Sequence, residues 1–126
     1  MSWFKSNKKI LIVEDQEDIA ENLRARLSLE NYDLFIAADG KKGVEEARAM
    51  IPDLIIMDVM LPILDGFEAT KLLRDGEETK HIPILILTAL PHVKDAEKAI
   101  ELGANDFLNK PFTNERLIQK VKKLLS

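Results

Sequence analysis

The chain has no cysteine and no long apolar run, and each absence excludes a class of protein. None of its 126 residues is a cysteine, so disulfides and thiol chemistry are excluded. No apolar run approaches the roughly 20 residues that a membrane-spanning helix needs. The first residues also lack the apolar core of a signal peptide. Because no targeting signal is found, we expect a cytoplasmic protein without membrane insertion.

Excess positive charge is lacking as well. The sequence has 18 Lys and Arg residues against 22 Asp and Glu residues, which gives a formal net charge of −4. Proteins that bind nucleic acid draw most of their affinity from Lys and Arg side chains on a broad basic face. The composition therefore predicts no direct contact with nucleic acid.

The length fits one domain and leaves no room for a second. A chain of this size buries about two-thirds of its unfolded surface and folds without disulfides. Residues 1–126 show no internal repeat and no linker. We expect a core from about residue 8 to residue 125, preceded by a leader over residues 1–7 that carries Trp3 and Phe4.

The sequence does contain short, β-branched-rich apolar runs that end at polar residues. The stronger runs span 10–13, 54–57, 84–87 and 106–109, and a weaker one spans 34–37. Such runs indicate strands buried on both faces, which is typical of a parallel sheet between helices. Segments with helical periodicity lie between them; the apolar face of one carries Ile19, Leu23 and Leu27, and that of the next Val44, Ala47 and Ile51. The pattern predicts an α/β fold with five strand-helix units.

Polar side chains follow the strands where function gathers in such sheets. Glu14 and Asp15 follow the first run, Asp58 the third, Thr88 the fourth and Lys110 the fifth. The carboxyl ends of parallel strands meet at one edge of the sheet, so we expect these side chains to lie together. An aspartate can accept a phosphoryl group, and clustered carboxylates repel one another unless a cation is bound. The set predicts phosphoryl chemistry with Mg²⁺ or Mn²⁺.

These motifs together resemble the receiver domain of response regulators in two-component signalling. The matching motifs are Glu14-Asp15, Asp58 with Leu61-Pro62 and Asp65-Gly66, Thr88-Ala89, and Lys110-Pro111-Phe112. The resemblance covers about residues 8 to 125, nearly the whole chain. It is specific because several separated motifs agree in order and spacing.

The resemblance implies a (βα)5 flavodoxin-like, doubly wound parallel sheet with strand order 2-1-3-4-5. It implies that a sensor histidine kinase or a histidine phosphotransfer protein phosphorylates Asp58. It also implies roles for other residues. The metal ligands would be Glu14, Asp15, Asp58 and the backbone carbonyl of Met60; the groups near the phosphoryl oxygens would be Thr88, Ala89 and Lys110; and the switch residues would be Thr88 and Phe107.

The resemblance further implies a signal carried by the face of helix 4, strand 5 and helix 5 to a protein partner. The chain would not be an enzyme beyond its own metal-dependent phosphorylation and slow dephosphorylation. It would act as a monomer or as a phosphorylation-dependent dimer, with a cis bond between Lys110 and Pro111. Met60 and Leu90 are both apolar, and we expect them to shield the acyl phosphate from water and to prolong the phosphorylated state.

Other functions remain open at this point. The chain could be a stand-alone regulator, a receiver fragment of a larger regulator or hybrid kinase, or a phosphorylation-independent interaction module. A nucleotide- or flavin-binding module would need a Gly- or Ser/Thr-rich loop after the first strand, where Glu14 and Asp15 lie. A phosphatase of the haloacid dehalogenase type would need its Asp-x-Asp motif after the first strand, whereas Asp58 follows the third.

Several site residues also have simpler interpretations. Glu14 and Asp15 could form the acidic first turn of a helix, and Phe107 could be an ordinary core residue. Asp39, Asp53 and Asp65 are assigned to caps and turns. His81 and His92 are expected to be solvated, and so is the basic face of the last helix, which carries Arg116, Lys120, Lys122 and Lys123.

Overall fold

The computed structural model describes residues 7–89 and 93–126, in which five strands alternate with five helices. The strands are β1 (Lys9–Val13), β2 (Asp33–Ala37), β3 (Leu54–Asp58), β4 (Ile84–Thr88) and β5 (Asp106–Asn109). The helices are α1 (Glu17–Ser28), α2 (Gly40–Met50), α3 (Gly66–Asp75), α4 (Val93–Glu101) and α5 (Asn114–Leu125). Trp3, Phe4, Leu90 and His92 lie outside the described residues.

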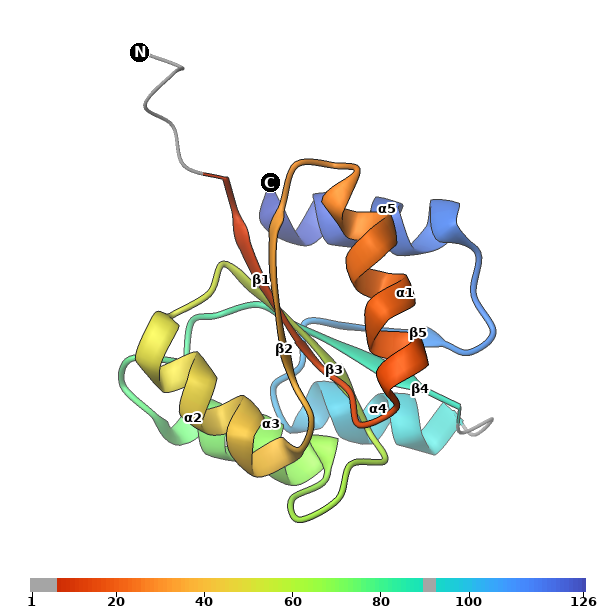
Figure 1. Cartoon of the computed structure of the whole chain (residues 1–126). Helices are drawn as coiled ribbons and strands as arrows, with labels where there is room; N and C mark the ends of the chain where they lie inside the picture. The colour runs from red at the N-terminus through yellow and green to blue at the C-terminus, as the bar shows by residue number, and fades with distance from the viewer. Residues whose placement is uncertain (1–6, 90–92) are drawn as a thin grey trace.

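The strands form one parallel sheet in the order β2-β1-β3-β4-β5, which confirms the predicted flavodoxin-like topology. Helices α1 and α5 cover one face of the sheet, and α2, α3 and α4 cover the other (Figure 1). Right-handed crossovers between parallel strands produce this three-layer arrangement. Among the described helices, none is long and apolar enough to cross a membrane.

Two apolar layers hold the sheet between its helices. Side chains alternate along each strand, so Leu11 and Val13 pack under α2 and α3, while Ile10 and Ile12 pack under α1 and α5. The central strand β3 is buried along its whole length. The side chains at the strand ends therefore project from a rigid, fully packed frame.

Two helix boundaries differ from the interpretations made from the sequence. Helix α1 begins at Glu17, so Glu14 and Asp15 precede it, and the acids of its first turn are Glu17 and Asp18. Interpreting Glu14-Asp15 as a helical first turn is therefore wrong. Ile51 was expected to continue the apolar face of α2, but it ends that helix in a left-handed conformation, with φ 47°, and is 38 % exposed.

The starts of α2 and α3 lie directly against the carboxyl ends of the strands. The carboxylates of Asp39 and Asp65 accept hydrogen bonds from backbone N–H groups in the first turns, which confirms both residues as caps. Asp65 and Glu68 form a full capping box. A Cβ atom at Gly66 would overlap the backbone carbonyl of Asp58, so only glycine lets α3 begin this close to β3.

Candidate functional site

Three carboxylates meet at the carboxyl ends of β1 and β3. Val13 pairs with Met57 in the sheet, so Glu14, which follows β1, lies beside Asp58, the last residue of β3. One oxygen atom from each of Glu14, Asp15 and Asp58 lies within 4.8 Å of the others. Glu14 and Asp58 are buried, whereas Asp15 is exposed. The arrangement is an acidic pocket with one side open to solvent.

Lys110 brings the facing positive charge from the end of β5. Its Nζ atom lies 3.3 Å from Oε1 of Glu14 and 3.5 Å from Oδ2 of Asp58. The backbone N–H of Lys110 donates a hydrogen bond to the backbone carbonyl of Thr88 at 2.8 Å. The Lys110–Pro111 peptide bond is cis, as the resemblance implied. Among the described residues, the cluster of three carboxylates thus has one ammonium group, paired with two of them, which leaves an excess of negative charge.

This excess appears in the protonation of Glu14. The pKa of the Glu14 carboxyl rises from 4.5 to about 7, because burial, and after it the hydrogen bond and negative charge of Asp58, raise it more than Lys110 lowers it. A proton near neutral pH thus compensates for part of the missing positive charge. Hard carboxylate oxygens at this spacing suit Mg²⁺ or Mn²⁺, so the residues present fit a divalent cation.

Thr88, Ala89 and Met60 lie around the carboxylates. Thr88 ends β4, the strand next to β3, and its side chain is buried, whereas Ala89 directly after it is exposed. Met60 lies two residues beyond Asp58 and is 66 % exposed. The structure thus places these residues at the same edge of the sheet, and their roles at a phosphoryl group stay predictions.

Phe107 lies beside Thr88 on one face of the sheet. It pairs with Ile86 in the register of β4 and β5, and residues two apart on a strand share a face, so Thr88 is its diagonal neighbour. Its ring is partly buried against the core under α2, α3 and α4. Its role as a switch residue is not tested by this placement and stays a prediction.

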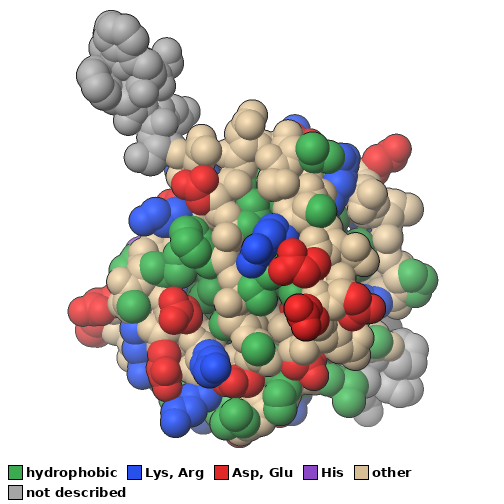
Figure 2. Space-filling model, viewed as in Figure 1, with side chains coloured by type: hydrophobic (Ala, Val, Ile, Leu, Met, Phe, Trp, Pro, Cys, Tyr) green, Lys and Arg blue, Asp and Glu red, His purple; other side chains and the backbone are tan. Residues whose placement is uncertain are grey.

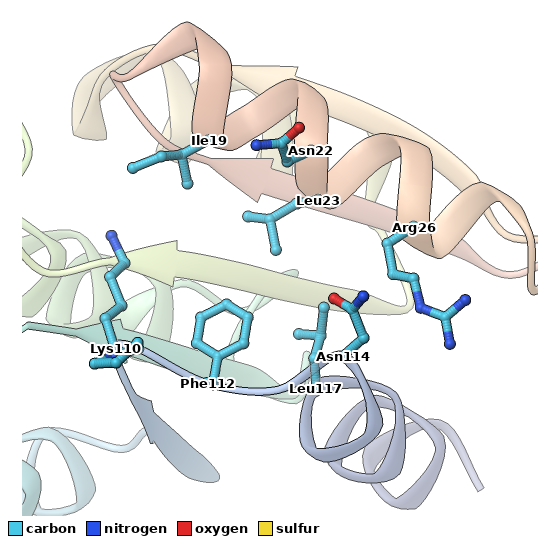
Figure 3. Close-up of a pocket in the computed structure, with 9 residues that line it drawn as sticks. Ile19, Asn22, Leu23, Arg26, Lys110, Phe112, Asn114 and Leu117 are labelled. Atoms are coloured by element: carbon cyan, nitrogen blue, oxygen red, sulfur yellow. The ribbon is translucent and has the colours of Figure 1, made fainter.

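A hollow of about 430 Å³ on the other face of the sheet has Lys110 in its lining (Figure 3). Figure 3 shows Ile19 and Leu23 of α1 above it, the Phe112 ring below, and Lys110 at one end. The surface of the hollow is largely apolar. Its existence could not be inferred from the sequence, although Phe112 belongs to the last motif.

The basic face of α5 is only partly solvated, which corrects one sequence interpretation. Lys120 is 19 % exposed, and its Nζ atom lies 2.9 Å from Oδ2 of Asp106 on β5. The Lys122 side chain is more exposed, and its Nζ atom lies 3.4 Å from Oε2 of Glu30. The Lys120–Asp106 pair could not be predicted from the spacing of residues in the sequence, because Lys120 belongs to α5 and Asp106 to β5. On the face shown in Figure 2, acidic and basic side chains are interspersed.

Comparison with known proteins identifies related chains. The family model described as "Response regulator receiver domain" matches residues 10–122. The Bacillus subtilis alkaline phosphatase synthesis transcriptional regulatory protein PhoP is 43 % identical over 119 residues, which cover 94 % of this chain and 49 % of PhoP. The Caulobacter vibrioides response regulator PleD is 39 % identical over 92 % of this chain and 26 % of PleD. The chain therefore spans half or less of these curated relatives.

Solved structures show the same similarity. The chemotaxis protein CheY4 of Vibrio cholerae matches with a TM-score of 0.88 and 32 % identity, over 94 % of this chain and 99 % of CheY4. The receiver domain of the Pseudomonas aeruginosa sensor histidine kinase PA1611 matches with a TM-score of 0.88 and 34 % identity, over 94 % of this chain and 98 % of that one. The PA1611 structure holds a magnesium ion in its active-site cleft.

Proposed function

We propose, because this chain belongs to the response regulator receiver domain family, that it accepts a phosphoryl group on Asp58 and passes the signal to a protein partner. One observation supports this most directly. The buried Asp58 carboxylate shares the edge of the sheet with Glu14 and Asp15, and Lys110 reaches it from the opposite side. An acceptor carboxylate, a set of cation ligands and a fixed ammonium group are the parts that such a transfer needs.

In the proposed reaction, a bond forms between a carboxylate oxygen of Asp58 and the phosphorus atom of the donor. The bond from phosphorus to the donor's nitrogen or oxygen breaks, and the leaving group departs with that electron pair. Lys110 holds one phosphoryl oxygen, and the Thr88 hydroxyl donates to another beside the exposed Ala89. Glu14, Asp15, Asp58 and the carbonyl of Met60 would hold Mg²⁺ or Mn²⁺, which neutralises charge on the phosphoryl oxygens when bound.

The proposal includes the direction of signalling. A sensor histidine kinase or a histidine phosphotransfer protein would supply the phosphoryl group, and the hollow beside Lys110 offers apolar surface within reach of such a donor. Phe107 would move into space vacated by Thr88 and alter the face formed by α4, β5 and α5 for the downstream partner. We also propose that the chain forms one domain and acts in the cytoplasm. The absence of cysteine is compatible with that compartment.

The test is the intact mass of the protein after incubation with acetyl phosphate and Mg²⁺. We expect the addition of one phosphoryl group, lost when the metal is chelated and lost in Asp58→Asn. Asp53→Asn is the matched control, because Asp53 precedes β3 at the opposite end of that strand. The proposal is wrong if Asp58→Asn gains the group as wild type does, or if folded, metal-bound wild type gains none. The second result would favour a phosphorylation-independent interaction module.

A further inference from the structure

Lys120 makes an ion pair that is more buried than the other pairs described outside the acidic pocket. Its Nζ atom lies 2.9 Å from Oδ2 of Asp106, and the two side chains are 19 % and 23 % exposed. The Lys122–Glu30 pair on the same helix is longer, at 3.4 Å, and its lysine is 58 % exposed. A shielded, short pair holds its side chains in one geometry more firmly than an exposed pair does.

This pair is attached directly to Phe107. The second carboxylate oxygen of Asp106, Oδ1, accepts a hydrogen bond from the backbone N–H of Phe107 at 2.8 Å. The Lys120 ammonium also lies 5.9 Å from the centroid of the Phe107 ring, within the range of a cation–π interaction. Lys120 therefore contacts both the carboxylate that fixes the backbone of Phe107 and the ring itself.

Part of the ring borders a hollow on its other side. A hollow of about 420 Å³ lies between α4 and β5, lined by Ala96, Glu97, Ile100, Glu101 and Phe107. Helix α4 therefore does not pack closely against the whole ring. Ile100 of α4, which also lines the hollow, is 46 % exposed. Because the core packs against only part of the ring, the cation on the α5 side contributes to its position.

We propose that Lys120 is a positioning residue that holds Phe107 in the conformation seen here and so opposes the phosphorylation switch. This inference rests on the proposed function, in which Phe107 moves toward Thr88. Such a movement takes the ring away from the Lys120 ammonium, while the Lys120–Asp106 pair remains. The contact between the Lys120 ammonium and the ring is therefore made only in the outward state, and it shifts the equilibrium toward that state.

Removing the ammonium should therefore favour the inward ring. From the usual strength of a cation–π contact at a partly exposed site, we expect Lys120→Met to raise the inward population two- to fivefold, as a rough estimate. Phosphorylation is linked to the same equilibrium. The acetyl phosphate concentration that gives half-maximal phosphorylation should also fall, because more of the protein starts in the conformation that phosphorylation favours.

The experiment has two readouts. The first is ¹⁹F NMR of unphosphorylated protein labelled with fluorophenylalanine, in which Phe107→Leu identifies the Phe107 signal among the five phenylalanines. In Lys120→Met the signal should move toward its position in phosphorylated wild type. The second is the acetyl phosphate dependence of the intact mass. Lys120→Arg, which keeps a cation, should behave as wild type in both.

Lys122→Met is the matched control, because Lys122 is a cation on the same helix that pairs with Glu30 and not with Asp106. It should change neither readout. Asp106→Asn weakens the ion pair and should shift both readouts in the direction of Lys120→Met. The inference is overturned if Lys120→Met leaves the Phe107 signal at its wild-type position, or if Lys122→Met shifts it equally. A wild-type protein that gains no phosphoryl group overturns the proposed function instead, and the ¹⁹F signal of the unphosphorylated variants still reports the Lys120 contact separately.

Discussion

At the scale of single residues, Glu14 is the group, among those that the structure describes, whose pKa is shifted into the neutral range. It is 1 % exposed, it faces the Asp58 carboxylate, and its pKa rises to about 7. The sequence predicted Glu14 as a metal ligand from its place after a strand. The sequence could not give the depth of burial, which depends on how α1, β2 and the Lys110 side chain close around the strand end.

The raised pKa predicts how the stability of the metal-free protein depends on pH. The folded state binds a proton more tightly than the unfolded chain, whose glutamate titrates at 4.5, so stability from this group is present below pH 4.5 and is lost as pH rises through 7. The loss is on the order of 3 kcal/mol in the free energy of unfolding. Urea unfolding in EDTA between pH 5 and pH 8 measures it.

Glu14→Gln should flatten this pH dependence, because its amide does not titrate. Glu17→Gln, which changes a carboxyl in the first turn of α1, should keep the wild-type slope. Parallel curves for wild type and Glu14→Gln would contradict the assignment of the titrating group to Glu14.

At the scale of elements, the strands were predicted closely and the helix ends were not. The apolar run 84–87 differs from β4 only by Thr88, and the run 54–57 differs from β3 only by Asp58. Both agree because strands buried on two faces must be continuously apolar. Helical periodicity shows which residues face the core, but it does not show where the chain turns. Ile51 matched the period of α2 and yet ends that helix.

The connection between β3 and α3 contains a second isoleucine in the left-handed conformation, Ile63, at which the cost of that conformation can be measured. Ile63 has φ 72° and is 76 % exposed, so a β-branched residue holds a left-handed conformation with little burial in return. Asparagine adopts this conformation more readily. We expect Ile63→Asn to raise the free energy of unfolding by about 1 kcal/mol, measured as a higher urea midpoint with an unchanged slope.

Leu29→Asn is the control for this substitution. Leu29 is 71 % exposed but has φ −66°, so the same loss of exposed apolar surface relieves no strain. An equal gain in both variants would show that the effect comes from surface polarity and not from the backbone at Ile63.

At the scale of the whole molecule, the topology accounts for what the sequence could predict of the site. Residues 14, 58, 88 and 110 lie far apart along the chain, and one rule about parallel sheets places them at one edge. Contacts between helices and strands follow no such rule. The pairing of Lys120 with Asp106 and the hollow beside Phe112 depend on how α5 settles on the sheet, and so only the structure shows them.

The same topology predicts that divalent metal stabilises the whole fold. The unfolded chain separates Asp58 from Glu14 and Asp15, so Mg²⁺ binds the folded state preferentially. At a Mg²⁺ concentration about ten times the dissociation constant, the free energy of unfolding should rise by about 1.4 kcal/mol. Urea unfolding over a Mg²⁺ titration, at ionic strength matched with KCl, measures this gain. Asp15→Asn should weaken it.

The gain should also depend on pH, because a proton on Glu14 competes with the metal. With a pKa of about 7, Glu14 is mostly protonated at pH 6 and mostly ionised at pH 8. The Mg²⁺ concentration that gives half the stabilisation should therefore be about tenfold higher at pH 6 than at pH 8. Glu14→Gln should abolish this difference. Equal half-saturating concentrations at the two pH values in wild type would show that Glu14 is not deprotonated when the metal binds, and would remove it from the set of ligands.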